Sequence, residues 1–563
     1  MHLPALHRWL PFLAWPRPTA ELLRGEFWAG MTVGLMLVPQ GVAYAHLAGM
    51  PLVTGIYASL VPALIAVLWS SSTRLGVGPT ALTSLLIGAS LTGLAEPGSA
   101  HWVQLAAWMA LLSGLLQLSL GVMRFGWLLN LVTSPVLGSF TQAAALLILA
   151  SQLPALLGLR TTWSALLDAP SPHHFDLRAM AFGLGSLALL MLARRWRSGF
   201  PAAMVVIALA ALASWGLGLA DAGVAVVGPV PSGLPAPYWP GWLPWDEFGA
   251  LTLPVLVITL VSFLETASSA KVDHARGGTR WNENQDLIAH GMAKISSGLC
   301  GSFATSASFS RSAINLYAGA QSGWATLFAL VLVLATLLWL TPALYHVPQA
   351  VLAAVVVTAV TGLIKPMGML RLWPVSRVET TIGLTTFVLT LASAPRLYWG
   401  VLAGLVMNLS HFLYQRLHPR IIEVGLHPDG SLRDRHLWQL APLAPQVLAL
   451  RMDAELDFAS AAALERRVAD ELAARPELRN LALFALPINR IDVTGVEAFM
   501  RLRALMQSRG GALHVAGLKL PVQRTLERAG VLHDGPDLRA WRTDAEAIAA
   551  LQPGDANEAA PAG

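Results

Sequence analysis

Two charged side chains stand in stretches that are otherwise apolar or small, and they are the best candidates for handling an ion. Arg311 follows the small, hydroxyl-rich run 302–310, and Glu265 is the only charged residue in the apolar stretch 251–270. A charge within a bilayer is costly and by default marks a functional site or a paired partner. The planar guanidinium of Arg311 would suit a tetrahedral oxyanion or a carboxylate. A purely structural ion pair between Arg311 and Glu265 is the alternative.

The segment that carries Arg311 cannot cross a bilayer as a helix. The apolar stretch 313–318 ends at Gly319, whereas a spanning helix needs about 20 residues. A half-helix that begins near Phe309 would direct free N–H groups and a positive dipole end toward an internal cavity. The backbone N–H groups of Phe309 and Ser310, together with the Ser310 hydroxyl, could then donate to an anion.

Glu265 has the chemistry that proton coupling requires. Desolvation raises the pKa of a carboxyl group, whereas a nearby arginine lowers it. A carboxyl group under both influences can gain and lose a proton as a cavity opens to each side of the membrane. We therefore predict that Glu265 couples anion movement to protons.

The composition indicates a membrane protein with a soluble domain after it. Of 563 residues, 55% are hydrophobic and 12% are charged, against about 25% charged in soluble domains. Charges become frequent from Arg420 onward. The predicted parts are a cytoplasmic N-terminal segment 1–26, a transmembrane domain 27–415, a linker 416–445, an α/β domain 446–550 and a disordered tail 551–563.

The predicted spans number about fourteen, and the third and tenth are short. They are 27–47, 52–70, 79–94, 102–122, 129–153, 179–193, 201–219, 251–270, 286–300, 311–320, 324–344, 347–364, 378–394 and 397–415. Arginines concentrate in the loops that an even count places inside, so both termini are predicted to be cytoplasmic, in a bacterial inner membrane. The same bias accounts for the net charge of +5 without a nucleic-acid partner.

Two segments that are too short or too polar to be clear membrane spans occupy matching places in the two halves of the chain. One is 75–80, which contains Gly76, Gly78 and Pro79, and the other is the run 302–312. Paired, interrupted hydrophobic segments are typical of transporters with inverted repeats and a site at the membrane midplane. The alternative is that glycine and proline are simply more frequent in membrane helices.

Several motifs, in order, resemble the SulP (sulfate permease) family of anion transporters. One departure is Thr73, where the family usually has serine. The motifs are Pro39-Gln40-Gly41-Val42-Ala43-Tyr44, Gly49-Met50-Pro51-Leu52-Val53-Thr54-Gly55, Arg74-Leu75-Gly76-Val77-Gly78-Pro79, Phe263-Leu264-Glu265, Asn284-Gln285-Asp286 and Ser308-Phe309-Ser310-Arg311-Ser312.

The resemblance implies two intertwined seven-span inverted repeats, divided into core and gate subdomains, and a homodimer. It implies a carrier of sulfate, bicarbonate or a dicarboxylate, and proton symport because the acidic residue at this position is a glutamate, Glu265. We expect an elevator-like movement and neither a cofactor nor a metal. Anion exchange remains open. The residues that it brings to the anion site are Gln40, Tyr44, Thr80, Phe309, Ser310 and Arg311.

General chemistry leaves two of these assignments open. Gln40 follows a proline, so its amide could bind the substrate or satisfy backbone groups that Pro39 leaves free. Tyr44 is more often an anchor at the membrane interface than a ligand.

The C-terminal part alternates strands with helices, which predicts an α/β domain. The motifs Ile491-Asp492-Val493-Thr494-Gly495 and Ala516-Gly517-Leu518-Lys519 resemble a STAS domain. Relatives with a phosphorylation switch have serine directly after the aspartate, whereas this chain has Val493. The predicted strands are 447–452, 481–485 and 512–517, and the predicted helices are 461–474, one around 496–506, and 522–529.

Two other classes of function compete with a transporter. A membrane-tethered signalling platform would rely on the STAS domain alone, but a mere anchor would not retain Gln40, Glu265 and Arg311 in its spans. An enzyme is disfavoured because the sequence shows neither a metal-ligand cluster nor a nucleophile–base pair. The pair His173–His174 has too few neighbouring ligands to predict a metal site.

Overall fold

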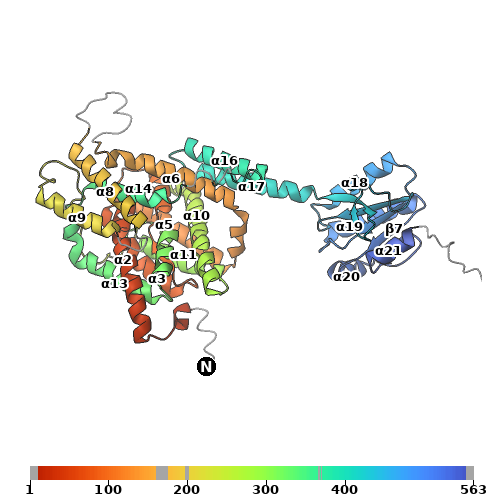
Figure 1. Cartoon of the computed structure of the whole chain (residues 1–563), viewed down its shortest axis with the longest axis horizontal. Coiled ribbons are helices and arrows are strands. Elements are labelled where there is room, and N and C mark those ends of the chain that lie inside the picture. Colours follow the sequence, from red (N-terminus) through yellow and green to blue (C-terminus); the bar gives the residue numbers. More distant parts are fainter. Residues whose placement is uncertain (1–9, 160–174, 197–201, 365–367, 369–370, 553–563) are drawn as a thin grey trace, which may run out of the picture. The chain divides into compact units, whose positions relative to one another are not determined.

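The structure is a computed structural model, and it describes residues 10–159, 175–196, 202–364, 368 and 371–552. The chain divides into two compact units, Met1–Asn408 and Leu409–Gly563 (Figure 1). The first unit is helical and the second is built on a sheet. His173, His174 and the predicted tail from Pro553 onward lie outside the described residues.

A helix occupies each of the fourteen segments in which the sequence predicts a span. Among the described residues, five helices are long and apolar enough to cross a membrane, and four other apolar helices are shorter. The helices are α2 (Ala20–Leu47), α3 (Leu52–Trp69), α4 (Ala81–Leu91), α5 (Ala100–Val122), α6 (Ser134–Leu156), α8 (Leu177–Trp196), α9 (Ala202–Gly216), α10 (Trp245–Gly277), α11 (Glu283–Leu299), α12 (Phe309–Tyr317), α13 (Trp324–Ala335), α14 (Gln349–Thr361), α16 (Arg377–Ala392) and α17 (Tyr398–Leu417).

The helices of the first unit fall into two packed groups. One contains α2, α3, α5, α10, α11 and α13, and the other contains α6, α8, α9, α14 and α16. Contacts of α14 and α9 with α2, and of α4 with α6, join the groups. The first group packs closely where α2 crosses α3: a β-carbon added at Gly55 would lie 1.9 Å from the carbonyl oxygen of Gly41.

A buried carboxylate fixes the turn after α3 against the start of α11. Asp286 is fully buried and accepts hydrogen bonds from the hydroxyls of Ser70 (2.7 Å), Ser71 (2.8 Å) and Ser72 (2.5 Å). It also accepts from the indole N–H of Trp281 at 2.8 Å. Since buried polar groups need such partners, Asp286 stabilises one conformation of this turn, which leads directly into the site described below.

The second unit is a six-stranded sheet with helices. Its strand order is β4-β3-β5-β6-β7-β8, with β5 to β8 parallel and β3 antiparallel to both of its neighbours. Strands β3 and β4 lie within the segment 416–445 that the sequence predicts as a linker, so the sheet begins before residue 446. The elements are β3 (Ile421–Leu426), β4 (Leu432–Asp434), β5 (Val447–Met452), α18 (Ala461–Ala474), β6 (Asn480–Phe484), α19 (Val493–Ser508), β7 (Leu513–Ala516), α20 (Leu520–Arg528), β8 (Leu538–Trp541) and α21 (Asp544–Leu551).

One buried carboxylate on β3 joins the residue after β4 and the end of α18 to the sheet. The carboxylate of Glu423 accepts hydrogen bonds from Arg435 at 2.7 Å and from Arg475 at 3.0 and 3.1 Å. Burial by itself would raise the pKa of Glu423, but the hydrogen bonds and charges of Arg475 and Arg435 outweigh it and lower that pKa. Glu423 therefore contributes stability while it is ionised.

We expect Glu423→Gln to lower the free energy of unfolding of the second unit by about 3 kcal/mol, because it removes the charge that two arginines face. Calorimetry of the full chain measures this effect, and Glu497→Gln, at an exposed position of α19, is the control. Because the folded-state pKa is lowered, this contribution is present above the unfolded pKa of about 4.3 and is lost as pH falls through the folded value. An equal loss in both variants would contradict the assignment.

Candidate anion site

Two short strands from distant parts of the chain pair at the centre of the first unit. Strand β1 (Gly76–Gly78) is antiparallel to β2 (Ser306–Ser308), with Gly76 opposite Ser308 and Gly78 opposite Ser306. The strands lead into the short helices α4 and α12, whose N-caps are Thr80 and Ser308. Non-helical backbone is tolerated at membrane depth only when it is buried in protein or lines a cavity, and this pairing satisfies its polar groups. The structure thus contains both predicted broken segments.

Two side chains of α12 hold this helix against the start of β1. The Ser312 hydroxyl accepts a hydrogen bond from the Gly76 N–H at 3.0 Å, and the Asn315 amide donates to the Arg74 carbonyl at 2.9 Å. A β-carbon on Gly76 would lie only 2.6 Å from the β-carbon of Arg311. The position of Arg311 therefore depends on the absence of a side chain at residue 76.

Arg311 lies inside the protein and makes no ion pair with any carboxylate of the described residues. Its side chain is 1% exposed. The guanidinium donates to the Gln40 amide oxygen at 3.0 Å and to the Pro79 carbonyl oxygen at 2.9 Å, and its Nε has no partner among the described residues. The alternative of a direct salt bridge with Glu265 is therefore wrong for this conformation. A guanidinium without a counterion keeps its positive charge available to an anion.

Gln40 and Tyr44 are both buried on α2 beside Arg311. The Gln40 amide oxygen orients the guanidinium instead of satisfying backbone near Pro39, and its amide nitrogen has no partner among the described residues. Tyr44 is 5% exposed, so it is no anchor at a membrane interface. It lies within electrostatic reach of both Arg311 and Glu265. Together these contacts place α2 beside the charged centre.

Thr80 joins the start of α4 to Glu265 on α10. Its hydroxyl donates to the Glu265 carboxylate, 3.1 Å from one oxygen and 3.4 Å from the other. The Thr83 N–H donates to the same Thr80 hydroxyl at 3.3 Å, which caps α4. Glu265 is half-buried, and Ser306 of β2 also contacts its side chain. A proton on Glu265 would therefore change the charge beside both short helices.

The first turn of α12 presents the donors that the sequence predicts. Ser308 caps the helix through the Arg311 N–H, which leaves the N–H groups of Phe309 and Ser310 without intrahelical partners. Phe309 is 53% exposed and Ser310 is also exposed. N–H groups without intrahelical partners at the positive end of a helix dipole, on exposed residues beside a buried arginine, form an arrangement that favours an anion.

The sequence prediction missed one charged residue of this region. Lys294 on α11 is fully buried, and its ammonium group donates to the Gln117 amide oxygen at 2.6 Å and to the Ser262 hydroxyl. The rule that singled out Arg311 applies here too, because Lys294 is the only charged residue besides Asp286 in the predicted span 286–300.

We expect Gly76→Ala to lower anion uptake about tenfold, because the new methyl group would push β1 away from Arg311 and remove an interaction of about 1.4 kcal/mol or more. Gly138→Ala on α6, where a β-carbon meets nothing within 4 Å, is the matched control. Uptake by each variant in proteoliposomes, corrected for the amount of folded protein, measures the effect. Normal uptake by Gly76→Ala would show that this contact does not position Arg311.

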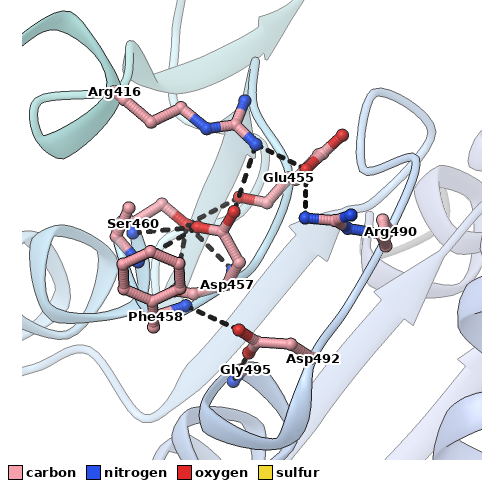
Figure 2. Close-up of polar contacts among 9 residues, drawn as sticks. Arg416, Glu455, Asp457, Phe458, Ser460, Arg490, Asp492 and Gly495 are labelled. Carbon is pink, nitrogen blue, oxygen red and sulfur yellow. Dashed lines mark hydrogen bonds and ion pairs between the residues drawn. The ribbon is translucent and has the colours of Figure 1, made fainter. Parts of the chain in front are cut away.

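A signalling platform would need a phosphorylation site at the start of α19 in the second unit. Asp492 caps α19 by accepting from the Gly495 N–H at 2.8 Å, and it also accepts from the Phe458 N–H at 3.0 Å (Figure 2). The next residue, Val493, is 77% exposed but has no group that can be phosphorylated. The neighbouring Thr494 is half-buried.

A small ionic cluster lies beside this loop. The Arg416 guanidinium pairs with Glu455 at 2.5 Å and with Asp457 at 3.1 Å, and Arg490 lies 3.4 Å from Glu455. Figure 2 shows these pairs as dashed lines. The pairs of Arg416 and Arg490 with Glu455 are partly exposed, and such pairs contribute about 1 kcal/mol or less each, whereas Asp457 is buried. The cluster therefore stabilises the loop that contains Glu455 and Asp457. Among the described residues, no group of three potential metal ligands occurs.

Comparisons with known families match both units. The family model described as "Sulfate permease family" matches residues 23–386, and the STAS domain model matches residues 440–543. A probable sulfate transporter of Mycobacterium tuberculosis is 31% identical over 517 residues, which cover 91% of this chain and 92% of that protein. Probable sulfate transporter 4.2 of Arabidopsis thaliana is 30% identical and covers 90% of this chain and 78% of its own length.

Solved structures share the fold at lower sequence identity. The murine solute carrier 26 family member A9, an anion transporter in its inward-facing state, has a TM-score of 0.87 at 21% identity. That match covers 98% of this chain and 95% of the murine chain. The transmembrane domain of a cyanobacterial bicarbonate transporter has a TM-score of 0.59 at 18% identity and covers 70% of this chain and 98% of that domain. The helical unit followed by a STAS domain is thus a known architecture.

Proposed function

We propose, from the premise that this chain belongs to the sulfate permease family of anion transporters, that it imports sulfate together with a proton. Its relatives in Mycobacterium tuberculosis and Arabidopsis thaliana are named as probable sulfate transporters. The protein is a multi-pass membrane transporter and not an enzyme. We further propose that it is a homodimer with both termini in the cytoplasm.

The observation that carries the proposal is the grouping of three features at the paired strands. Arg311 is a buried cation without an ion pair among the described residues, the N–H groups of Phe309 and Ser310 are free, and Glu265 bonds to the cap of α4. The cation and N–H groups would bind sulfate, while the carboxyl group would take up the proton. Gln40, Tyr44 and Thr80 would orient these groups. Each single interaction is modest, at about 0.3–2 kcal/mol for a helix terminus, so a bound anion can leave again.

The movement that we propose is elevator-like. Strands β1 and β2 and helices α4 and α12 contact mainly α2, α3 and α10, so the site belongs to the first packed group. The second group, with α6, α8, α9, α14 and α16, would serve as the gate. Sliding of the first group past the second would expose the same site to each side of the membrane. Protonation of Glu265 would remove a negative charge beside the anion and so favour its binding.

Uptake of labelled sulfate into proteoliposomes with an acidic exterior tests this function. We expect accumulation of sulfate that collapses when a protonophore removes the gradient. Uptake that does not depend on the proton gradient but requires an anion inside the proteoliposomes would indicate anion exchange. Uptake of bicarbonate or a C4-dicarboxylate in place of sulfate would change the substrate, and no uptake of any small anion would favour the signalling platform.

A further inference from the structure

Lys294 is a buried cation that has no role in the proposed transport cycle. It has no exposed surface, and its ammonium group faces oxygen atoms of Gln117 on α5 and Ser262 on α10. The Ser262 hydroxyl gives its own proton to the Thr259 carbonyl at 3.1 Å, so a lone pair is left for Lys294. The Lys294 nitrogen therefore acts as the donor in both contacts, as an ammonium ion with three donors and no lone pair does.

No carboxylate of the described residues forms an ion pair with Lys294, so neutral oxygens alone solvate this charge. An isolated charge within a membrane domain is costly unless another charge shares its surroundings. Glu265 follows Ser262 by three residues on α10, which places them on the same face of the helix. Ser306 links them, because its hydroxyl donates to the Ser262 carbonyl at 3.2 Å and its side chain also contacts Glu265.

The charged and titratable groups around Glu265 come from three other elements. Arg311 approaches from α12, Lys294 from α11 and Tyr44 from α2. His290 lies one turn before Lys294 and is within electrostatic reach of Asp286, whose carboxylate is occupied by the turn after α3. Two cations therefore act on the site beside one carboxyl group that can lose its charge.

We propose that Lys294 is a specificity-determining residue that makes the site select divalent oxyanions over monovalent anions, without touching the anion itself. With Glu265 protonated, Arg311 and Lys294 give the site a net charge of two, which matches sulfate. With Glu265 ionised, the net charge is one, and a divalent anion is held less tightly. This inference rests on the proposed sulfate transport and extends it to the class of substrate. Coulomb attraction acts through space and is strong where water is scarce, so direct contact is unnecessary.

The test compares Lys294→Gln, which keeps hydrogen-bond donors but loses the charge, with Lys294→Arg, which keeps the charge. Proteoliposomes measure the initial rates of labelled sulfate and labelled nitrate uptake, each with wild-type protein as reference. We expect the sulfate-to-nitrate ratio to fall about tenfold in Lys294→Gln, the effect of one lost charge in a partly desolvated site, and to stay near the wild-type value in Lys294→Arg. Lys271→Met, on the exposed side of α10, is the control and should leave the ratio unchanged.

Two results would overturn the inference. One is an unchanged ratio in Lys294→Gln, and the other is an equal loss of sulfate and nitrate uptake, which would make Lys294 purely structural. Should Lys294→Gln fail to fold, Gln117→Glu supplies the second readout, because it places a negative charge against the ammonium group and should lower the ratio in the same way. An unchanged ratio in that variant would also overturn the inference. Failure of the proposed function is distinguishable, because wild-type protein itself would then carry no sulfate.

Discussion

Arg311→Ala should lower sulfate uptake at least about thirtyfold, because charge-assisted hydrogen bonds contribute about 1.5–3 kcal/mol each and this variant removes the buried cation beside α12. The loss would extend beyond the anion contact itself. Gln40 and the Pro79 carbonyl would lose the group that they orient, so the start of α4 would lose its link to α12. Initial rates of labelled sulfate uptake measure the effect.

Arg311→Lys separates charge from geometry. A lysine keeps the positive charge, but its compact ammonium group cannot reproduce the planar fork that reaches both Gln40 and the Pro79 carbonyl. We expect intermediate uptake with a weaker apparent affinity for sulfate. Arg377→Ala, on the exposed start of α16, is the matched control. Wild-type affinity in Arg311→Ala would contradict the role given to Arg311.

Glu265→Gln should abolish the acceleration of sulfate uptake by external acid. The glutamine keeps a group that can bond to Thr80, but it cannot bind or release a proton. It resembles the protonated state of Glu265, so anion exchange should continue in the variant while accumulation driven by a proton gradient should stop. Uptake is measured at a series of external pH values, in parallel with exchange of labelled against unlabelled sulfate.

The control for this experiment is Glu21→Gln, which neutralises an exposed carboxylate in the first turn of α2. It should keep the pH dependence of the wild-type protein. Acid-stimulated uptake that persists unchanged in Glu265→Gln would remove Glu265 from proton coupling. Loss of both exchange and uptake would instead assign Glu265 to the integrity of the site, through its bond to Thr80.

The sequence was sufficient to predict the elements that differ from their surroundings in local composition, such as an isolated charge or an interrupted apolar stretch. Arg311 stands out because nothing else in its segment is charged, and the short helix α12 follows from the glycine that ends its apolar stretch. The same reasoning located α4 and Glu265. Strand β5 and helix α18 also agree with their predicted bounds, because β5 is an apolar run buried almost throughout and α18 buries one regular apolar face.

The features that the sequence could not predict depend on contacts between distant residues. The pairing of β1 with β2 joins segments more than two hundred positions apart, and three-residue strands have no pattern of their own. The partner of Gln40 follows from that pairing, because it brings Arg311 beside α2. Strand β4 has only three residues, two of them charged, and the apolar run of β3 is interrupted by Glu423, so neither shows a clear strand pattern in the sequence. Lys294, in contrast, could have been predicted from the sequence, because it is a charged residue within the predicted span 286–300.

The most direct test of the central claim is a structure of the protein with selenate, a sulfate analogue that anomalous X-ray scattering can locate. We predict one selenium peak in the transport unit, within hydrogen-bonding distance of the N–H groups of Phe309 and Ser310 and close to Arg311. That peak should disappear in Arg311→Ala. A selenium peak away from the start of α12, or one that persists in Arg311→Ala, would contradict the claim that the paired short helices form the anion site.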